Sequence, residues 1–243
     1  MKDYKPIMSF GEDVAKGYRD VQRGDEAAAV AFLAQLAGQG PVLELAIGAG
    51  RIALPLAAKG LRVDGIDIAP AMVAQLRTKP GGDALAVTIG DFADVPVPGA
   101  YSLIYVVWNT IFNLLTQEDQ VRCFENVARH LTGDGCFVVE TYVPTFLYRL
   151  RNDQYVDAEA IQVDEVRLDL LRHDMVQQRI EESHVTLSAA GVHLNPIVQR
   201  YAWPAELDLM ARIAGLRLQQ RWGGWNREPF TAASSAHVSV YGR

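Results

Sequence analysis

The sequence predicts an α/β protein with a doubly wound sheet of seven strands, the last of them antiparallel, and a small antiparallel sheet inserted after the fifth strand. Apolar segments typical of buried strands alternate with helical segments through residues 25–141, as in a parallel sheet covered on both faces. The pattern then changes to period two. The chain closes with two strands too near each other in sequence for a helical crossover.

The first part of the chain supplies five strands and the helices between them. Asp25 is placed to cap the first helix, Pro70 opens another at a position where a missing N–H is harmless, and Gly133 follows the end of a helix that starts with a capping-box pattern at Thr116. Helices are expected at residues 25–38, 51–59, from 70 onward and at 116–131. Strands are expected at residues 42–46, 62–68, 84–88, 101–107 and 136–140.

The second part of the chain departs from this rhythm after residue 141. A polar stretch that is helical in part leads into residues 184–198, which alternate with period two around an Ala-Ala-Gly turn and predict an antiparallel hairpin. A helix at 204–215 and strands at 216–222 and 237–241 complete the sheet. We therefore divide the chain into a cap and first helix at 1–40, a core at 41–141 and 204–243, and an inserted sheet at 142–203.

Composition excludes several classes of function. The net charge of −6 over 243 residues argues against a nucleic-acid partner, since such a surface needs clustered Lys and Arg. The N-terminus MKDYKPIMSF lacks the apolar core of a signal peptide and no apolar run approaches a membrane span, so we expect no membrane partner and a cytoplasmic protein. Cys123 and Cys136 are expected to be buried free thiols, and no spacing of His, Asp and Glu indicates a metal.

The stretch PVLELAIGAGRIALPLAAKGLRVDGIDIA first suggests a dinucleotide-binding fold. From Gly48 it matches G-x-G-x-x-A, and Asp67 follows 19 residues later, where such folds place the acid that binds a ribose. Glu44 argues against NAD, because a carboxylate at the end of a central strand points into the ligand crevice and is best balanced by a cationic ligand. S-adenosyl-L-methionine carries an ammonium and a sulfonium. The antiparallel last strand is also foreign to the NAD-binding sheet.

Taken in order, the segments VLELAIGAGRIALPLA, VDGIDIAPAM, IGDFADVP, VVWNTIFNL and LMARIAGLRL with the closing HVSVYGR resemble the successive motifs of class I S-adenosylmethionine-dependent methyltransferases. The resemblance covers residues 25–243, apart from the inserted sheet, and implies a seven-stranded sheet with an antiparallel last strand. Ala46 stands where the family has its first motif glycine. A methyl group fits there if the backbone is extended.

The resemblance implies a role for each matched position around the first two strands. Glu44 would hold the amino-acid end of the cofactor, while Gly48 and Gly50 let the chain pass close to the adenosine. Asp67, with Ile68 beside it, would bind both ribose hydroxyls.

Further positions would complete the cofactor site. Met72 would cover the adenine, and Asp91 and Phe92 would bind its edge and face. Trp108 and Asn109, at the end of strand four, would line the passage to the reactive methyl.

Two smaller groups share this layout: aminosugar N-methyltransferases of antibiotic pathways and N-terminal amine methyltransferases of peptide antibiotics such as cypemycin. Both have a capping N-terminal segment, which GYRDVQRGDEAAAV resembles. Tyr18 would close over the cofactor, and Arg23 would meet its carboxylate. The aminosugar enzymes also place an antiparallel sheet over the sugar, so residues 142–203 would cover the substrate.

The acceptor nitrogen must be neutral to attack a methyl group. Glu140, in VVETYV at the end of strand five, is the best candidate to hold an ammonium and relay its proton, and a structural acid bonded to backbone or to Tyr142 is the alternative. His130 at a helix end is expected to be structural. His184 and His193 fall in the inserted hairpin, where one can face the acceptor, although a histidine in an exposed sheet is commonly only solvated.

The function expected from the sequence is methylation of a small molecule by S-adenosyl-L-methionine, first of all N-methylation of an amine such as a nucleotide-linked aminosugar in secondary metabolism. A peptide amine and a small-molecule hydroxyl remain open as acceptors. An NAD(P)-dependent oxidoreductase and a non-catalytic member of the fold are the alternatives of other classes. The edges of the inserted sheet would allow pairing between subunits in a homodimer.

Overall fold

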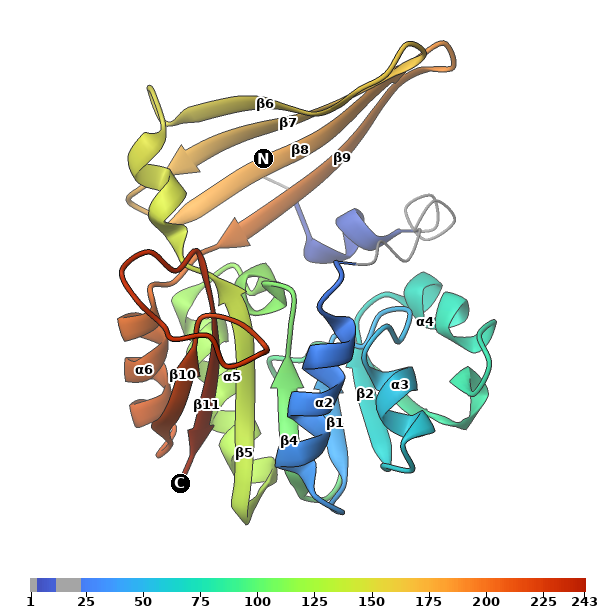
Figure 1. The fold of residues 1–243 in the computed structure, drawn as a ribbon, viewed down its shortest axis with the longest axis vertical. Coiled ribbons are helices and arrows are strands. Elements are labelled where there is room, and N and C mark those ends of the chain that lie inside the picture. The colour runs from blue at the N-terminus through green and yellow to red at the C-terminus, as the bar shows by residue number, and fades with distance from the viewer. Residues whose placement is uncertain (1–3, 12–22) are drawn as a thin grey trace.

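The computed structural model describes residues 4–11 and 23–243, and Figure 1 shows an α/β core beneath a separate, tilted sheet. The core sheet has seven strands in the order β10-β11-β5-β4-β1-β2-β3. Only β11 runs antiparallel to its neighbours, pairing in this way with both β5 and β10. This confirms the predicted seven-stranded sheet with an antiparallel last strand. Its strands are β1 Val42–Leu45, β2 Val63–Asp67, β3 Ala86–Ile89, β4 Tyr101–Val106, β5 Leu131–Tyr142, β10 Arg217–Trp222 and β11 Ala236–Gly242.

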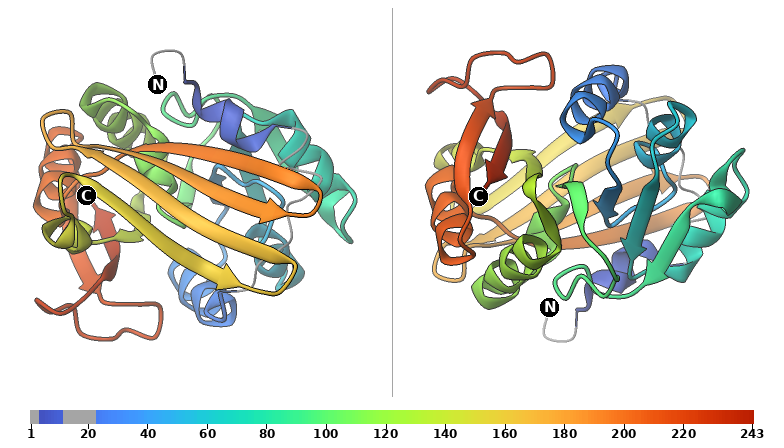
Figure 2. Two further views of the ribbon diagram at one scale, coloured as in Figure 1. Left: turned by 90° about the horizontal axis from the view of Figure 1, so that it is seen from above. Right: turned by 90° about the horizontal axis from the view of Figure 1, so that it is seen from below.

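Helices cover both faces of the core sheet (Figure 2). Side chains of α2, α3 and α4 join one buried cluster, and those of α5 and α6 join the cluster on the other face. The helices are α2 Glu26–Ala37, α3 Ala53–Ala58, α4 Pro70–Arg77, α5 Gln117–His130 and α6 Pro204–Ile213. The short 3-10 turns are η1 Pro6–Phe10, η2 Gly82–Ala84, η3 Thr110–Asn113 and η4 Pro144–Arg149.

Helix ends follow the local sequence in most places. Thr116 caps α5 by accepting the Asp119 N–H at 3.0 Å, and Pro70 begins α4. Asp25 occupies the N-cap of α2 as expected, but its side chain makes no cap hydrogen bond. The Glu26 carboxylate instead accepts the N–H groups of Arg23 and Gly24, at 2.7 and 3.0 Å.

A four-stranded antiparallel sheet, here called the roof, lies across the carboxyl ends of the core strands (Figures 1 and 2). Its strands are β6 Gln154–Ile161, β7 Glu165–Asp174, β8 Arg179–Ser188 and β9 Gly191–Arg200. The predicted hairpin is β8 and β9. The expectation of helix in part before it was wrong beyond the 3-10 turn η4, because β6 and β7 are strands.

Two expectations from composition can be compared with the structure. Cys123 and Cys136 are both free and buried. Within the described part of the chain, no helix is both long enough and apolar enough to cross a membrane.

Candidate active site

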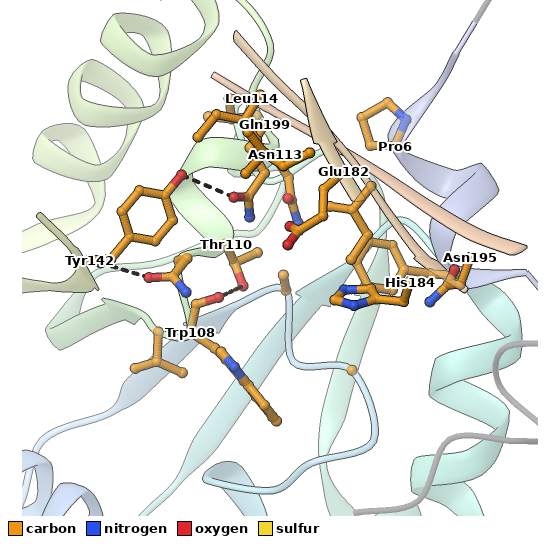
Figure 3. A pocket seen from close by; sticks show the side chains of 18 of the residues that line it. Pro6, Trp108, Thr110, Asn113, Leu114, Tyr142, Glu182, His184, Asn195 and Gln199 are labelled. Atoms are coloured by element: carbon orange, nitrogen blue, oxygen red, sulfur yellow. Dashed lines mark hydrogen bonds between the residues drawn. The ribbon is translucent and has the colours of Figure 1, made fainter. Parts of the chain in front are cut away.

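A cavity of about 1720 Å³ lies between the carboxyl ends of the core strands and the underside of the roof. Figure 3 shows side chains from both layers converging on it. Such crevices at strand ends are the usual ligand site of doubly wound sheets. The sequence-predicted residues that line it are Glu44, Ala46, Gly48, Asp67, Ile68, Met72, Asp91, Phe92, Trp108 and Asn109.

Asp67 lies at the end of β2 and is held by the backbone around it. Its Oδ2 accepts the Gly48 N–H at 2.6 Å, and its Oδ1 accepts the Ala69 N–H at 2.8 Å. Burial raises the pKa of Asp67, and these hydrogen bonds oppose the rise. Each carboxylate oxygen has a second lone pair, so both remain able to accept a hydroxyl from the cavity.

Ala46 corrects one expectation. Its φ of 58° places it in the left-handed region and not in the extended conformation in which its methyl group was expected to fit. A Cβ in this conformation costs about 1–2 kcal/mol, which is why glycine suits the position. The chain therefore carries local strain at the cavity wall.

Gly48 and Gly50 have different surroundings. A Cβ on Gly48 would lie 3.6 Å from the Met72 Cε, which is ordinary contact beside the cavity. A Cβ on Gly50 would lie 2.4 Å from the Leu76 Cδ1, so this glycine is required by packing against α4. Gly50 does not appear in the cavity lining.

Glu44 is buried in the central strand β1 and lines the cavity at one side. The Tyr105 hydroxyl donates to its Oε2 at 2.8 Å. Burial raises the pKa of Glu44 to about 8, against the opposing effects of the Tyr105 hydrogen bond and the Arg51 charge. A cation placed beside this carboxyl would favour its ionised form.

Asp91 and Phe92 follow β3 and line the cavity. The Asp91 Oδ1 accepts the Ala93 N–H at 2.8 Å, which fixes the carboxylate next to the cavity. Phe92 and Met72 are nearly buried and present apolar surface there.

Trp108 and Asn109 form a strained pair after β4, with φ of 58° and 61°. Non-glycine residues rarely adopt this region, and neighbouring contacts must hold them in it. The Asn109 Oδ1 accepts the Tyr142 N–H at 2.7 Å, and the Trp108 N–H donates to the Glu140 Oε2 at 2.5 Å. The Arg51 guanidinium stacks on the Trp108 ring, 3.3 Å from its centroid.

Glu140, predicted to hold the acceptor ammonium, has other partners in the structure. Besides accepting from Trp108, it forms an ion pair with Arg23 at 3.1 Å and does not appear in the cavity lining. These contacts favour a role in positioning Trp108. Arg23, predicted to meet the cofactor carboxylate, is held at this ion pair, and Tyr18 lies outside the described residues.

Sequence reasoning assigned no role to several groups that line the cavity. Pro6 and Phe10 from η1 reach it, and the roof contributes Glu182 and Asn195, beside His184, one of the two histidines that were expected to be able to face the acceptor (Figure 3). The available signal was the period-two alternation in β8 and β9, which places every second side chain on the face turned to the core.

Comparison with known proteins identifies the family. The CcbJ methyltransferase of Streptomyces caelestis is 34% identical and superimposes with a TM-score of 0.89, over 98% of each chain. The chain belongs to the S-adenosylmethionine-dependent methyltransferases. A methyltransferase-domain family model matches residues 42–135.

Two further relatives extend the comparison. The methyltransferase is 27% identical to the cypemycin N-terminal methyltransferase of a Streptomyces species over 204 residues, covering 83% of this chain and 82% of that protein. It also shares its fold with CalS10, an amino pentose methyltransferase of Micromonospora echinaspora solved with S-adenosylmethionine bound, at 19% identity, 93% coverage of each chain and a TM-score of 0.65.

The side of the cavity that the carboxyl ends of the core strands form is here called the floor. It fits S-adenosyl-L-methionine, the cofactor of the methyltransferase. Asp67 keeps acceptor capacity for hydroxyls, and the buried Glu44 carboxyl can ionise beside a ligand with cationic groups, which would favour its charged form. The space beside Gly48 leaves the backbone open to close approach.

Proposed function

We propose that this methyltransferase transfers a methyl group to the nitrogen of a small-molecule amine in secondary metabolism. A nucleotide-linked aminosugar is the first candidate, and a peptide amine or a small-molecule hydroxyl is the alternative. The supporting observation is the charge of the roof. Its part of the cavity is lined by Glu159, Glu165 and Glu182, and the only arginine lining it among the described roof residues, Arg167, lies 3.4 Å from Glu165. Such a surface favours a cationic acceptor.

The names of the relatives support a nitrogen acceptor. One relative methylates the N-terminus of cypemycin, and the fold neighbour CalS10 is an amino pentose methyltransferase. The cavity is also larger than one drug-sized ligand needs, which leaves room for an acceptor beside the cofactor.

The proposed cofactor contacts follow the residues of the floor. Asp67 binds the ribose hydroxyls, Asp91 and Phe92 bind the adenine edge and face, and Met72 covers the ring. Glu44 holds the amino-acid end, since its carboxyl is buried and faces the same cavity.

The end of the cofactor that carries the reactive methyl group lies towards the loop after β4. Trp108 and Asn109 line the passage between floor and roof, and Arg23 meets the cofactor carboxylate by exchanging its Glu140 partner. S-adenosyl-L-methionine supplies an electrophilic methyl: the amine lone pair forms the new N–C bond while the C–S bond breaks and its electron pair stays on sulfur. The residues around it align the two reactants and exclude water.

The test uses methyl-labelled S-adenosylmethionine and paired acceptors. A nucleotide-linked aminosugar and a peptide with a free N-terminus are each compared with a counterpart in which a hydroxyl replaces the amine. Label on the amines alone, with release of S-adenosylhomocysteine, is the expected result. Equal or faster transfer to the hydroxyl counterparts would refute the proposed acceptor class.

We further propose a homodimer formed through the roof. Strand β6 is an outer strand of this sheet with mostly exposed side chains, and an unpaired edge can pair with a second copy. Sedimentation equilibrium gives the mass directly, and a monomer at micromolar concentration would exclude this contact.

A further inference from the structure

We propose that the roof holds the acceptor ammonium through Glu182, and that His184, oriented by Asp169, is the general base that removes its proton. This inference rests on the proposed N-methylation. It assigns to the roof the role that the sequence suggested for Glu140.

The geometry of His184 is that of an oriented base. Asp169 and His184 are directly opposed on β7 and β8, and the His184 Nδ1 lies 2.5 Å from the Asp169 Oδ1. A carboxylate only accepts, so the neutral ring carries its proton on Nδ1 and its lone pair on Nε2. His184 lines the cavity, and its Nε2 has no hydrogen bond to any residue that the structure describes.

Glu182 lies two residues earlier on the same face of β8. Figure 3 shows both side chains descending from the roof into the cavity, with Glu182 between His184 and Asn113. Burial raises the pKa of Glu182, and the nearby Asp169 and Glu159 charges add to the rise, while His184 opposes it. A bound ammonium would replace the lost solvation and bring this carboxylate a charge-assisted hydrogen bond.

Asn195 adds a third acceptor. It pairs with His184 across β8 and β9 and lines the same cavity, and its buried Oδ1 has no partner within the described residues. A carboxylate, an imidazole lone pair and an amide oxygen are all acceptors, and an ammonium offers three N–H donors to them. The chemical class that matches this set is a primary or secondary ammonium.

The proton step balances within these residues. The ammonium gives one proton to the His184 Nε2, its N–H bond electrons become the nitrogen lone pair, and the imidazole becomes an imidazolium beside the Asp169 carboxylate. The His184 side chain is 34% exposed, so the proton can then leave to solvent.

A metal site is the competing interpretation of the same residues. The candidate ligand atoms of Glu159, Asp169 and His184 lie within 4.8 Å of one another. The direct contact between the Asp169 and His184 side chains favours the base, because an ion would have to separate these two atoms. The test therefore includes metal removal.

The charged groups that face His184 bear on any pH profile. They come from three strands: Glu159 on β6, Asp169 on β7 and Glu182 on β8, whereas β9 offers Asn195 directly opposite and His193 two residues away from Asn195.

The experiment compares the full-length parent with His184→Gln and Glu182→Gln on the amine that the parent methylates fastest. His184→Gln should lower kcat about 100-fold or more at pH 7. This loss of kcat should become smaller as pH rises, because more of the amine is then already neutral in solution. A merely structural defect would not show this pH dependence. Glu182→Gln should mainly raise KM, by about tenfold. S-adenosylhomocysteine affinity should stay within twofold in both. His130→Gln, on α5 away from the cavity, is the matched control.

A second readout is independent of turnover. Nitrogen-15 NMR of labelled histidine should find the neutral His184 ring protonated on Nδ1 in the parent, and Asp169→Asn should weaken this preference.

The outcomes separate the two proposals. Methylation of hydroxyls alone overturns both, whereas amine methylation by His184→Gln within twofold of the parent overturns only the assignment of the base. Loss of parent activity in a chelator, restored by a divalent cation, shows a metal site in its place.

Discussion

The buried carboxyl of Glu44 makes the stability of the ligand-free protein depend on pH in a defined direction. An unfolded glutamate releases its proton near pH 4.5, whereas Glu44 in the folded protein does so at about 8. Between these values the folded state binds more protons than the unfolded state, so the contribution of this group to the free energy of unfolding is present at low pH and falls as pH rises. Glu44→Gln removes the titration but keeps an amide oxygen that accepts from Tyr105.

The magnitude follows from one proton. A single group that titrates in this way changes the free energy of unfolding by about 1.4 kcal/mol per pH unit, so the parent should lose about 2 kcal/mol relative to Glu44→Gln between pH 6 and pH 7.5. The variant should match the parent only below about pH 4.5, should already be the more stable protein at pH 6, and should lead the parent by about 2 kcal/mol more at pH 7.5. Urea unfolding of both proteins at several pH values measures the difference.

The control for this prediction is Glu118→Gln, at an exposed position on α5, which should leave the pH dependence of the parent unchanged. A difference between the parent and Glu44→Gln that stays constant with pH would refute the burial argument. Calorimetry of S-adenosylmethionine binding in buffers of different ionisation enthalpy adds a check, because a cation beside Glu44 should expel its proton at pH 7 in the parent and not in the variant.

Three further predictions concern the floor of the cavity and Glu140, which lies outside the cavity lining. Asp67→Asn should weaken S-adenosylhomocysteine binding by about 10- to 100-fold in calorimetry, since a charge-assisted bond to a ribose hydroxyl is worth about 1.5–3 kcal/mol; an affinity within twofold of the parent would exclude the ribose role. Ala46→Gly should raise the free energy of unfolding by up to about 1 kcal/mol in urea by relieving the left-handed strain, and a less stable variant would contradict it. Glu140→Gln should keep kcat within about tenfold of the parent, since an amide oxygen still accepts from Trp108, whereas a 100-fold loss would restore Glu140 as the proton relay.

The core was predictable because its central strands are buried on both faces and its turns are marked by Gly and Pro. Strand β1 is buried at all four positions, and the segment reads as a short apolar run interrupted only by Glu44. Of the roof, only the hairpin of β8 and β9 could be predicted from the sequence. In β6 seven of eight residues are exposed, so the strand has no buried apolar face that a sequence pattern could reveal. Its pairing with β7 is determined by the tertiary structure.

The candidate site divides in the same way. Asp67 and Asp91 follow strands that the sequence marks clearly, so their meeting at one sheet edge could be expected. The conformations of Ala46 and Trp108 could not, because a left-handed backbone at a residue other than glycine leaves no compositional signal. The partners of Glu140 depend on Arg23, which is far away in sequence and reaches it only in the folded chain.

The two layers of the cavity explain why a base belongs to the roof. The floor suits a cofactor with a sulfonium, and the acidic roof suits an ammonium, so productive binding brings two positive charges together. Their repulsion is strong where water is excluded, and an ammonium has no lone pair with which to attack. Removing the proton solves both problems at once. Glu140 at the end of β5 is already engaged with the Trp108 N–H, whereas the base that we propose, His184, has a 34% exposed side chain from which the proton can leave to solvent. The imidazolium then forms among carboxylates that stabilise it.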